Sequence, residues 1–490
     1  MESPPVPARH VVHALPPEVQ SLIQLQITRL EELRKQRGDQ SRGQSHWDVL
    51  PDVLVGSDFI ARTLTGTPTL MDGLNTVENS ADFNQLRQRV EAISGSREEV
   101  GAALRRVRQE EIVRLGWRDL AGIAPLGEVL ETLSTLADSA IGVALTCAYD
   151  ELRERFGEPI GESSGQPVQL SVLGLGKLGG RELNMSSDVD LVFAYRENGV
   201  TDGIRTISNH EFFIKLGQAL IDILQTPTHE GIVFRVDMRL RPNGDSGPLA
   251  LSFDAMDHYF LTHGRAWERY ALIKARPVAG DVAAGHDLLA SLRPFVYRKY
   301  LDFGAFESIR TMKTLIEREL NKKSLTGNVK LGRGGIREIE FIVQSHQLIY
   351  GGRNPALRTS SLYDALAALE DNGVLTDHDC AMMRRHYDFL RVLEHRLQIM
   401  DDAQTHTVPV EPLARTRIAL TMGYPEINAF DTAVESVNDA VHRLFLTVFH
   451  QDRGPAASEN NPLFADIWED TLASEDQLTQ LRALGFDDAE

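Results

Sequence analysis

Two aspartates separated by one residue stand at the start of an apolar run. Asp188 and Asp190 follow the glycine-rich stretch LGLGKLGGRELNMSS and begin DVDLVFAY. Because side chains two apart on a strand share a face, both carboxylates project to one side while Val189 points away. Carboxylates this close repel each other unless a hard cation binds between them, and Mg²⁺ takes a few such oxygens together with the phosphates of its substrate. The pair predicts a metal site that handles phosphate, and the alternative is a set of solvated acids on an edge strand.

A third acid, Asp237, lies in the alternating run GIVFRVDMRLRP. Period two predicts a strand with one apolar face, formed by Ile232, Phe234, Val236, Met238 and Leu240, and a polar face formed by Val233, Arg235, Asp237, Arg239 and Arg241. By itself, Asp237 among arginines is equally well explained by surface ion pairs. Together with Asp188 and Asp190 it completes a three-carboxylate set. Such a set can hold two Mg²⁺ ions, or Mn²⁺ as a substitute, for an in-line displacement at phosphorus, which indicates nucleotidyl transfer.

The glycines before the aspartates have the spacing of a dinucleotide-binding turn, Gly174, Gly176 and Gly179. A dinucleotide fold needs a crossover helix of a dozen or more residues after this turn, but only RELNMSS separates Gly180 from Asp188. A P-loop is also excluded, because Lys177 is followed by Leu178 instead of Ser or Thr. The glycines therefore need another use.

Several residues near the aspartates could hold phosphate. The backbone and hydroxyl donors that we expect to approach phosphate oxygens are Gly179, Gly180, Ser186 and Ser187. Residues 235 to 276 contain seven basic and five acidic residues within a chain of net charge −19. The basic candidates for neutralising charge in the transition state are Arg239, Arg241, Lys274 and Arg276. Each of them is also compatible with an ordinary surface position.

A second glycine turn, in LGRGGIREIEF at 331 to 341, opens a helix that carries Arg337, Glu338 and Glu340. These three are possible additional site residues. Two glutamates two positions apart on a helix cannot share a face, so at most one should reach the site. The alternative is that the helix dipole simply favours acids at this N-terminus.

The pattern of apolar residues divides the chain into four parts. Helical spacing predicts an N-terminal helical domain at 1–160 and a C-terminal helical domain at 281–452, which could contribute residues to the active site. Between them, a core at 161–280 contains the strands VQLSVLGLG and DVDLVFAY and an amphipathic helix over 210–225 with Asn209 as N-cap. Residues 453–490 read as a linker and the start of a further segment. The predicted fold class is α+β, predominantly helical, with a small mixed sheet.

Composition excludes several classes of partner. A net charge of −19 disfavours nucleic acid and anionic membrane surfaces. The N-terminus MESPPVPARH lacks the apolar core of a signal peptide, and we find no apolar run approaching the roughly 18 residues that span a bilayer. The two cysteines, Cys147 and Cys380, are far apart and match no zinc spacing. These features predict a cytoplasmic protein that binds neither nucleic acid nor a membrane.

The run GLGKLGGRELNMSSDVDLVF resembles the nucleotidyltransferase signature of the bifunctional glutamine synthetase adenylyltransferase/adenylyl-removing enzymes, members of the DNA polymerase β-like superfamily. Further matches span about 168 to 410 and are GIVFRVDMRLRPNGDSGPLALSF, GRAWERYALIKARP, RPFVYRKYLDF and NVKLGRGGIREIEFIVQSHQLIYGGRNP, continuing through DDAQTHTVP. In that family two homologous halves lie in one chain. The ELNxSSDxDLxF form, the upstream helical region and DDAQTHTVP look like the N-terminal half, which removes AMP from a tyrosine of glutamine synthetase.

The resemblance implies a specific reaction, phosphorolysis. Inorganic phosphate would attack the α-phosphorus of the tyrosyl-AMP and give ADP and unmodified glutamine synthetase, with Asp188 and Asp190 as metal ligands and Asp237 as the third carboxylate. Phosphate is already anionic and needs no strong general base. The family is also regulated by the PII signalling protein, whose uridylylated form stimulates removal.

Two other functions are compatible with the same residues. One is the forward reaction, which transfers AMP from ATP to the tyrosine and uses the same carboxylates. The other is a non-catalytic module that binds nucleotide or PII, which has no need to concentrate three repelling carboxylates. A nucleic-acid polymerase is disfavoured by the acidic surface.

Overall fold

A computed structural model describes residues 15–37, 47–298, 303–320 and 325–447. The described residues up to His442 form one compact unit, and those from Arg443 onward belong to a second. The linker expected at 453–490 lies outside the described residues. Residues 1–442 are not divided at 160 and 280, so the domain boundaries placed there stay predictions.

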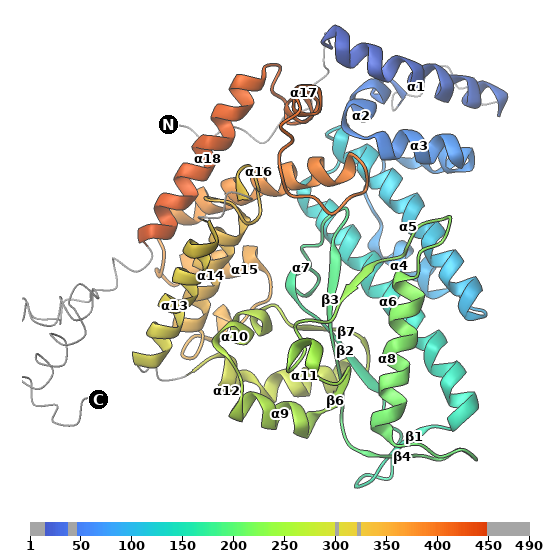
Figure 1. The fold of residues 1–490 in the computed structure, drawn as a ribbon, viewed down its shortest axis with the longest axis vertical. Coiled ribbons are helices and arrows are strands. Elements are labelled where there is room, and N and C mark those ends of the chain that lie inside the picture. The colour runs from blue at the N-terminus through green and yellow to red at the C-terminus, as the bar shows by residue number, and fades with distance from the viewer. Residues whose placement is uncertain (1–14, 38–46, 299–302, 321–324, 448–490) are drawn as a thin grey trace, which may run out of the picture. The chain divides into compact units, whose positions relative to one another are not determined.

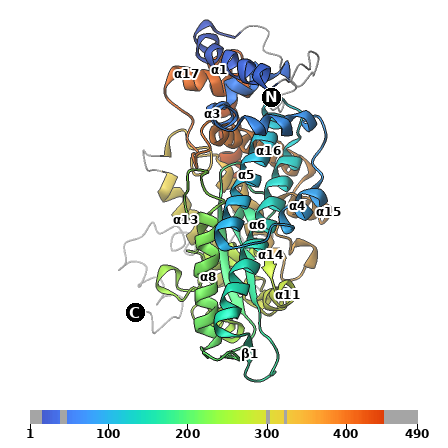
Figure 2. The same cartoon turned by 90° about the vertical axis from the view of Figure 1, so that its right-hand side faces the viewer.

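The N-terminal region is helical, as its apolar spacing predicts. Its elements are α1 (Pro17–Gln36), α2 (Leu50–Gly56), α3 (Asp58–Gly66), the 3₁₀ helix η2 (Pro68–Thr76), α4 (Phe83–Glu91), α5 (Arg97–Leu120) and α6 (Leu126–Phe156). Helix α5 begins with a capping box in which the Ser96 side chain accepts from the Glu99 N–H and the Glu99 carboxylate accepts from the Ser96 N–H. Helices α5 and α6 run side by side through the core (Figure 2).

Helix α6 departs from one sequence expectation. It contains an 18-residue window with a mean hydropathy of 1.2, long and apolar enough to cross a membrane by composition. Of that window 72% is buried inside the protein, where α6 packs against α4, α5, α8 and the sheet. An apolar helix of this length is also what the core of a large α+β protein requires.

The sheet that carries the aspartates has the strand order β5–β3–β2–β7, and β6 also pairs with β3. Its strands are β2 (Leu170–Gly174), β3 (Asp188–Tyr195), β5 (Arg235–Asp237), β6 (Ala250–Ser252) and β7 (Arg276–Gly280). Strand β2 is antiparallel to β3 and β7, whereas β5 and β6 are parallel to β3, so the sheet is mixed as predicted. All residues of β2 are buried, which explains its continuous apolar run. The prediction of an α+β, mainly helical fold with a small mixed sheet is confirmed.

Strand β5 is much shorter than the alternating run that predicted it. The N–H groups of Val233 and Phe234 donate to the carbonyl of Leu224 at 3.0 and 2.9 Å, so this backbone closes the end of the preceding helix instead of pairing in the sheet. After Asp237 the chain turns, because the N–H of Arg239 donates to Asp237 Oδ1 at 2.8 Å. The expected alternation of faces fails before β5, since Val233 and Phe234 are both buried.

Four short strands were not expected from the sequence. Strand β7 follows Lys274 at the end of the core predicted at 161–280, and β6 contributes three further residues. Strands β1 (Pro159–Gly161) and β4 (Gly199–Thr201) form a separate antiparallel pair. Runs this short carry too little period-two signal to be separated from loops.

Helix α8 (Asn209–Gln225) follows β3 and β4 and leads back to β5, which lies parallel to β3. Its apolar stripe is buried as predicted, with Phe213, Leu216 and Leu220 fully covered. The N-cap is Ser208 and not Asn209, because the Ser208 hydroxyl accepts from the Glu211 N–H at 3.1 Å. Asn209 is the first helical residue, and its amide donates to the carbonyl of Ile160. In Figure 1, α6 and α8 lie on one side of the sheet and α9–α12 on the other.

The remaining elements are mostly helical. They are the four-residue α7 (Gly176–Gly179), the 3₁₀ helices η3 (Gly244–Ser246) and η5 (Pro355–Leu357), α9 (Phe253–Thr262), α10 (Ala266–Ile273), α11 (Val282–Ser291), α12 (Arg293–Val296), α13 (Phe303–Leu320), α14 (Ile336–Tyr350), α15 (Leu362–Asp371), α16 (Asp377–Ile399), α17 (Pro412–Thr421) and α18 (Ile427–Thr447). Helix α14 begins within LGRGGIREIEF, where the sequence predicts that a helix opens, and extends to Tyr350.

Candidate active site

Three carboxylates meet at the edge of the sheet where β3 and β5 lie side by side. In the parallel pairing, Asp188 is opposite Arg235 and Asp190 is opposite Asp237. Neighbouring strands lie about 4.8 Å apart, so the backbones of Asp190 and Asp237 are adjacent. Val189 is fully buried on the opposite face, whereas the three aspartates are half-buried. Chain segments separated by 47 positions in sequence thus bring the three predicted acids together.

The charges of these acids are poorly compensated. Burial, followed by the charges of Asp188 and Asp237, raises the pKa of Asp190 to about 7. Burial also acts to raise the pKa of Asp237, but hydrogen bonds from the side chain and N–H of Arg239 outweigh it and lower that pKa. Arg239 itself is largely exposed, with 74% of its side chain accessible. The charges of Lys330 and Arg239 oppose the rise in the pKa of Asp190 without cancelling it, and a cation next to Asp190 would relieve the remaining repulsion.

The donor set suits a hard divalent cation, because all three groups are carboxylates. Within the part of the chain that the structure describes, however, no three Asp, Glu, His or Cys side chains converge into a ready-made metal cage. Both Asp237 oxygens accept hydrogen bonds from Arg239. The set fits a cation in its chemistry, provided that Arg239 leaves Asp237 when the cation binds.

The glycines have a packing role that their spacing did not reveal. A Cβ at Gly179 would lie 1.7 Å from the carbonyl oxygen of Lys274, so this glycine allows α7 to approach the start of β7. A Cβ at Gly180 would lie 3.0 Å from the carbonyl oxygen of Ser360. The glycine that touches the carboxylates is Gly176, where a Cβ would lie 2.4 Å from Asp190 Oδ2 and φ is +53°. Phosphate contacts by Gly179 and Gly180 stay predictions that these close contacts do not support.

The two serines hold the segment that precedes β3. Ser186 is buried, its N–H donates to Gln398 Oε1 at 3.0 Å, and its hydroxyl accepts from Arg235 at 2.6 Å. The hydroxyl of Ser187 accepts from the N–H of Asn184 at 3.3 Å. The N–H and the hydroxyl oxygen of Ser186 are therefore engaged within the protein, and of the two serines Ser187 is the half-exposed candidate for phosphate.

The basic candidates separate into two groups. Lys274 is buried and paired with Glu182 at 2.7 Å and Glu340 at 3.1 Å. Arg276 is bidentate to Asp138 and also donates to the carbonyls of Leu178 and Gly179. Both are committed to structural ion pairs, which argues against direct phosphate contacts.

Arg239 and Arg241 follow β5. Arg241 donates to the carbonyls of Met238 and Gly247 and so holds the turn after the strand. Of the four arginines and lysines predicted to neutralise phosphate, only Arg239 contacts one of the three aspartates directly.

The helix α14 acids point in different directions, as their spacing predicted. Glu338 is buried and lies 3.1 Å from Nδ1 of His442. Glu340 pairs with Lys274, and although burial acts to raise its pKa, the charges of Lys274 and Lys177 lower it. Arg337 is half-buried, and its N–H donates to the carbonyl of Lys330 at 3.0 Å.

Two lysines in the glycine-rich runs, Lys330 and Lys177, were not predicted as site residues. The charge of Lys330 opposes the rise in the pKa of Asp190, and Lys330 is half-buried in the loop before α14. Burial lowers the pKa of Lys177 to about 8, although Glu394 at 2.7 Å opposes this shift. Both lysines lie in glycine-rich runs that the sequence analysis singled out, GLGKLGG and NVKLGRGG. The sequence of such a run does not predict which acidic residue its lysine will contact.

A mixed sheet with an Asp-x-Asp strand next to a third acid on the parallel neighbour, entered from a glycine turn, is the core of a nucleotidyltransferase. Comparison with known proteins makes the assignment more specific. A model of the family described as glutamate-ammonia ligase adenylyltransferase matches residues 47–291, which include the whole sheet. A second model, GlnD PII-uridylyltransferase, matches residues 310–449.

Relatives named bifunctional glutamine synthetase adenylyltransferase/adenylyl-removing enzyme are closely similar. The protein of Nitrosococcus oceani is 43% identical over 97% of this chain and 50% of its own length. The protein of Chromobacterium violaceum is 49% identical over 80% of this chain and 43% of its own length. The protein of Pseudomonas aeruginosa is 43% identical over 89% of this chain and 46% of its own length. This chain belongs to the glutamate-ammonia ligase adenylyltransferase family, and it spans about half the length of the curated relatives that it matches. The family resemblance inferred from the sequence is confirmed.

Proposed function

We propose that this chain removes AMP from an adenylylated tyrosine of glutamine synthetase by phosphorolysis. The observation that carries the proposal is the grouping of Asp188 and Asp190 with Asp237 on two parallel strands. The relatives' printed name, which includes adenylyl removal, supports the substrate. An oxygen of inorganic phosphate attacks the α-phosphorus, the bond from phosphorus to the tyrosine oxygen breaks, and that oxygen takes up a proton. The products are ADP and unmodified glutamine synthetase.

Asp188, Asp190 and Asp237 would hold two Mg²⁺ ions, for which Mn²⁺ could substitute. Such ions neutralise charge on the attacking and leaving oxygens of an in-line displacement. The protein's own side chains would supply the remaining positive charge. Arg239 is exposed enough to exchange Asp237 for a phosphate oxygen, and Lys330 adds a second cation beside Asp190.

The direction of the reaction rests on the resemblance of ELNMSSDVDLVF to the adenylyl-removing half. The forward reaction, AMP transfer from ATP, would use the same three carboxylates. Phosphorolysis has the advantage that its nucleophile is already anionic and needs no catalytic histidine. We also propose that uridylylated PII stimulates the reaction, because residues 310–449 match the family of an enzyme named for PII.

The deciding experiment is to incubate the chain with adenylylated glutamine synthetase and Mg²⁺, with and without inorganic phosphate, and to identify the nucleotide released. ADP that appears only with phosphate supports the proposal. Formation of the AMP adduct from ATP and unmodified glutamine synthetase, without phosphate-dependent ADP, would assign the forward reaction instead. If neither reaction runs with uridylylated PII present, the chain is a binding module.

The aspartates provide the matched variants for this experiment. We expect Asp188→Asn and Asp190→Asn each to lower turnover by at least about 10²-fold, because each removes a charge that positions the cations. Asp287→Asn is the control, since Asp287 lies exposed on α11 and pairs only with Arg196 at the surface. Near-normal turnover in both site variants would rule out the carboxylate site.

A further inference from the structure

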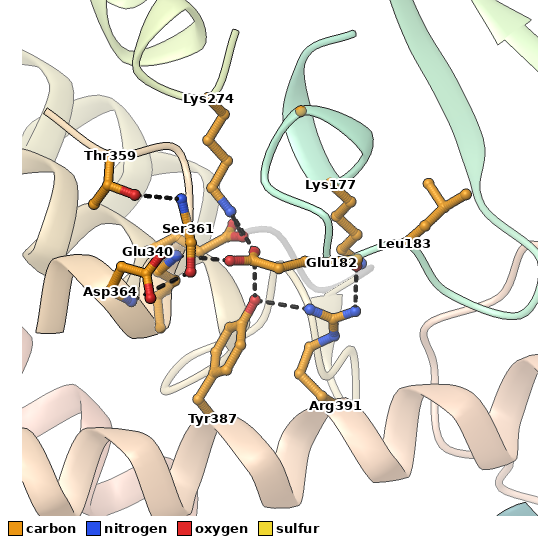
Figure 3. Close-up of polar contacts among 12 residues, drawn as sticks. Lys177, Glu182, Leu183, Lys274, Glu340, Thr359, Ser361, Asp364, Tyr387 and Arg391 are labelled. Carbon is orange, nitrogen blue, oxygen red and sulfur yellow. Dashed lines mark hydrogen bonds and ion pairs between the residues drawn. The ribbon is translucent and has the colours of Figure 1, made fainter. Parts of the chain in front are cut away.

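The six residues that lead into the catalytic strand are enclosed by buried polar contacts. Residues 182–187 connect α7 to Asp188, and all but Ser187 are buried. Figure 3 shows Glu182 surrounded by side chains from separate elements, including Lys274, Tyr387 and Arg391. The proposed chemistry leaves Glu182 and the α16 side chains without a role.

Glu182 is 1% exposed and every one of its polar groups is engaged. Its Oε2 accepts from Lys274 at 2.7 Å and from the Tyr387 hydroxyl at 3.0 Å, while Oε1 accepts from the N–H of Leu362 at 2.7 Å. Its own N–H donates to the carbonyl of Lys177 at 2.7 Å. The partners come from the loop before β7, from α16 and from the start of α15.

Side chains of helix α16 form hydrogen bonds with every second residue of the segment 182–187. Arg391 donates from one nitrogen to the Glu182 carbonyl and to Asn184 Oδ1, both at 2.5 Å, and Gln398 accepts from the N–H of Ser186. Contacts at 182, 184 and 186 are followed directly by the carboxylates at 188 and 190. One helix therefore fixes the path of the chain up to the first residue of the catalytic strand.

Burying these charged side chains is an inefficient way to stabilise the fold. Arg391 is fully buried, and its guanidinium is 3.3 Å from the equally buried Glu394. Removing such charges from water costs several kcal/mol per ion, and well-packed apolar residues often stabilise a core equally well. What apolar residues cannot provide is a directional contact to a chosen carbonyl and a chosen amide.

We propose that Arg391 and Glu182 are positioning residues that set the place of Asp188 and Asp190 relative to Asp237. The segment that they hold belongs to the region matched by the adenylyltransferase family, whereas α15 and α16 belong to the region matched by the PII-uridylyltransferase family. The helical region after residue 310 is thus part of the catalytic architecture. The inference rests on the proposed function only in taking these carboxylates as the reacting centre, and it holds for either direction of AMP transfer.

The test compares two buried arginines of the same helix. Arg391→Lys keeps the charge but cannot reach Tyr387, Glu182 and Asn184 together. Arg396→Lys is the control, because Arg396 is 5% exposed and pairs with Asp119 of α5, away from residues 182–187. We expect kcat for ADP release to fall by about 10²-fold in Arg391→Lys with KM for adenylylated glutamine synthetase within twofold, because small misplacements of reacting groups cost this much. The control should lose comparable thermal stability and keep kcat within about threefold.

A second variant and a second readout keep the result decisive. If Arg391→Lys does not fold, Asn184→Ala removes one acceptor of Arg391 and should lower kcat in the same way at a smaller magnitude. Mn²⁺ affinity, measured by electron paramagnetic resonance without substrate, should fall at least fivefold relative to the Arg396→Lys control.

The two proposals fail separately. If the wild-type chain releases no ADP, phosphorolysis is wrong, and the Mn²⁺ titration still tests the positioning role. If kcat and Mn²⁺ affinity in the folded Arg391→Lys or Asn184→Ala variant both match the control, the positioning role is wrong, whatever reaction the chain catalyses.

Discussion

Gly176 is the glycine that packs directly against a proposed catalytic carboxylate, that of Asp190. It has φ of +53°, and a Cβ would lie 2.4 Å from Asp190 Oδ2. In Gly176→Ala the Asp190 carboxylate must move away from the added methyl group. We expect turnover to fall by about 10²-fold, because the reacting groups tolerate only small displacements. The measurement is the rate of nucleotide release at saturating substrate.

The control for Gly176→Ala separates this contact from backbone strain. Gly165 has φ of +63° and nothing within 4 Å of a Cβ, so Gly165→Ala introduces similar strain, about 1 kcal/mol, without a steric contact. Both variants should show a similar small decrease in melting temperature, and only Gly176→Ala should lose activity. Equal turnover in the two variants would contradict the role given to Gly176.

At the scale of single residues, sequence reasoning succeeds where the chemistry is local. Asp188 and Asp190 share a face because of strand periodicity, and Asp237 was found from its alternating run. It fails for Lys330, whose charge acts on Asp190 from a distant part of the chain, and for Lys177, which pairs with the distant Glu394. The phosphate contacts predicted for Lys274 and Arg276 stay predictions, because a buried ion pair, which both residues form here, and a phosphate ligand require the same residue type.

At the scale of elements, α16 combines a positioning role with sensitivity to acid. Burial, followed by the charge of Arg385, lowers the pKa of His386 on this helix from 6.5 to about 4. Between these values the unfolded state binds more protons than the folded state, so folding stability falls as pH falls from about 6.5 to about 4. At about 1.4 kcal/mol per pKa unit, this one histidine accounts for up to about 3 kcal/mol.

We therefore expect His386→Gln to flatten the dependence of unfolding free energy on pH between 6.5 and 4. The measurement is urea unfolding at several pH values, and the change in slope matters more than the absolute stability. His378→Gln is the control, because His378 is exposed on the first turn of the same helix. A pH dependence identical to that of the wild type would show that His386 titrates normally.

Elements with strong periodicity were predictable, and short ones were not. Helix α14 and strands β2 and β3 follow their sequence patterns closely, because long runs average out local exceptions. The predicted strand at 231–240 is reduced to β5 because the end of α8 takes the N–H groups of Val233 and Phe234. That competition between a helix end and a strand depends on tertiary contacts that periodicity does not contain.

At the scale of the whole molecule, the N-terminal helices and the region from α16 onward are joined by ion pairs whose arginines are buried. Arg396 pairs with Asp119, Arg108 with Asp402, and Arg417 with Asp58. These pairs contribute to the contacts within the compact unit that ends at His442, and the domain boundaries expected at 160 and 280 stay predictions. Charged residues are usually placed at the surface when a sequence is read alone, so their role in joining distant regions is hidden.

The pair between Arg417 and Asp58 makes the single-unit arrangement testable. Arg417 is 6% exposed, is 2.8 Å from Asp58, and also donates to the carbonyls of Leu54 and Val55. Arg417→Ala should lower the free energy of unfolding by about 3 kcal/mol, because it removes the ion-pair partner of the partly buried Asp58, which keeps the hydrogen bond from Gln26, and a donor to two carbonyls. The exposed pair of Arg62 with Asp401 at 2.9 Å joins the same two regions and is the control, and Arg62→Ala should cost less than about 1 kcal/mol. Urea unfolding followed by tryptophan fluorescence should give one shifted transition for Arg417→Ala, because both regions lose their common contact together. Equal effects of the two variants would mean that burial adds nothing to this contact, and the two helical regions would then be held together by apolar packing alone.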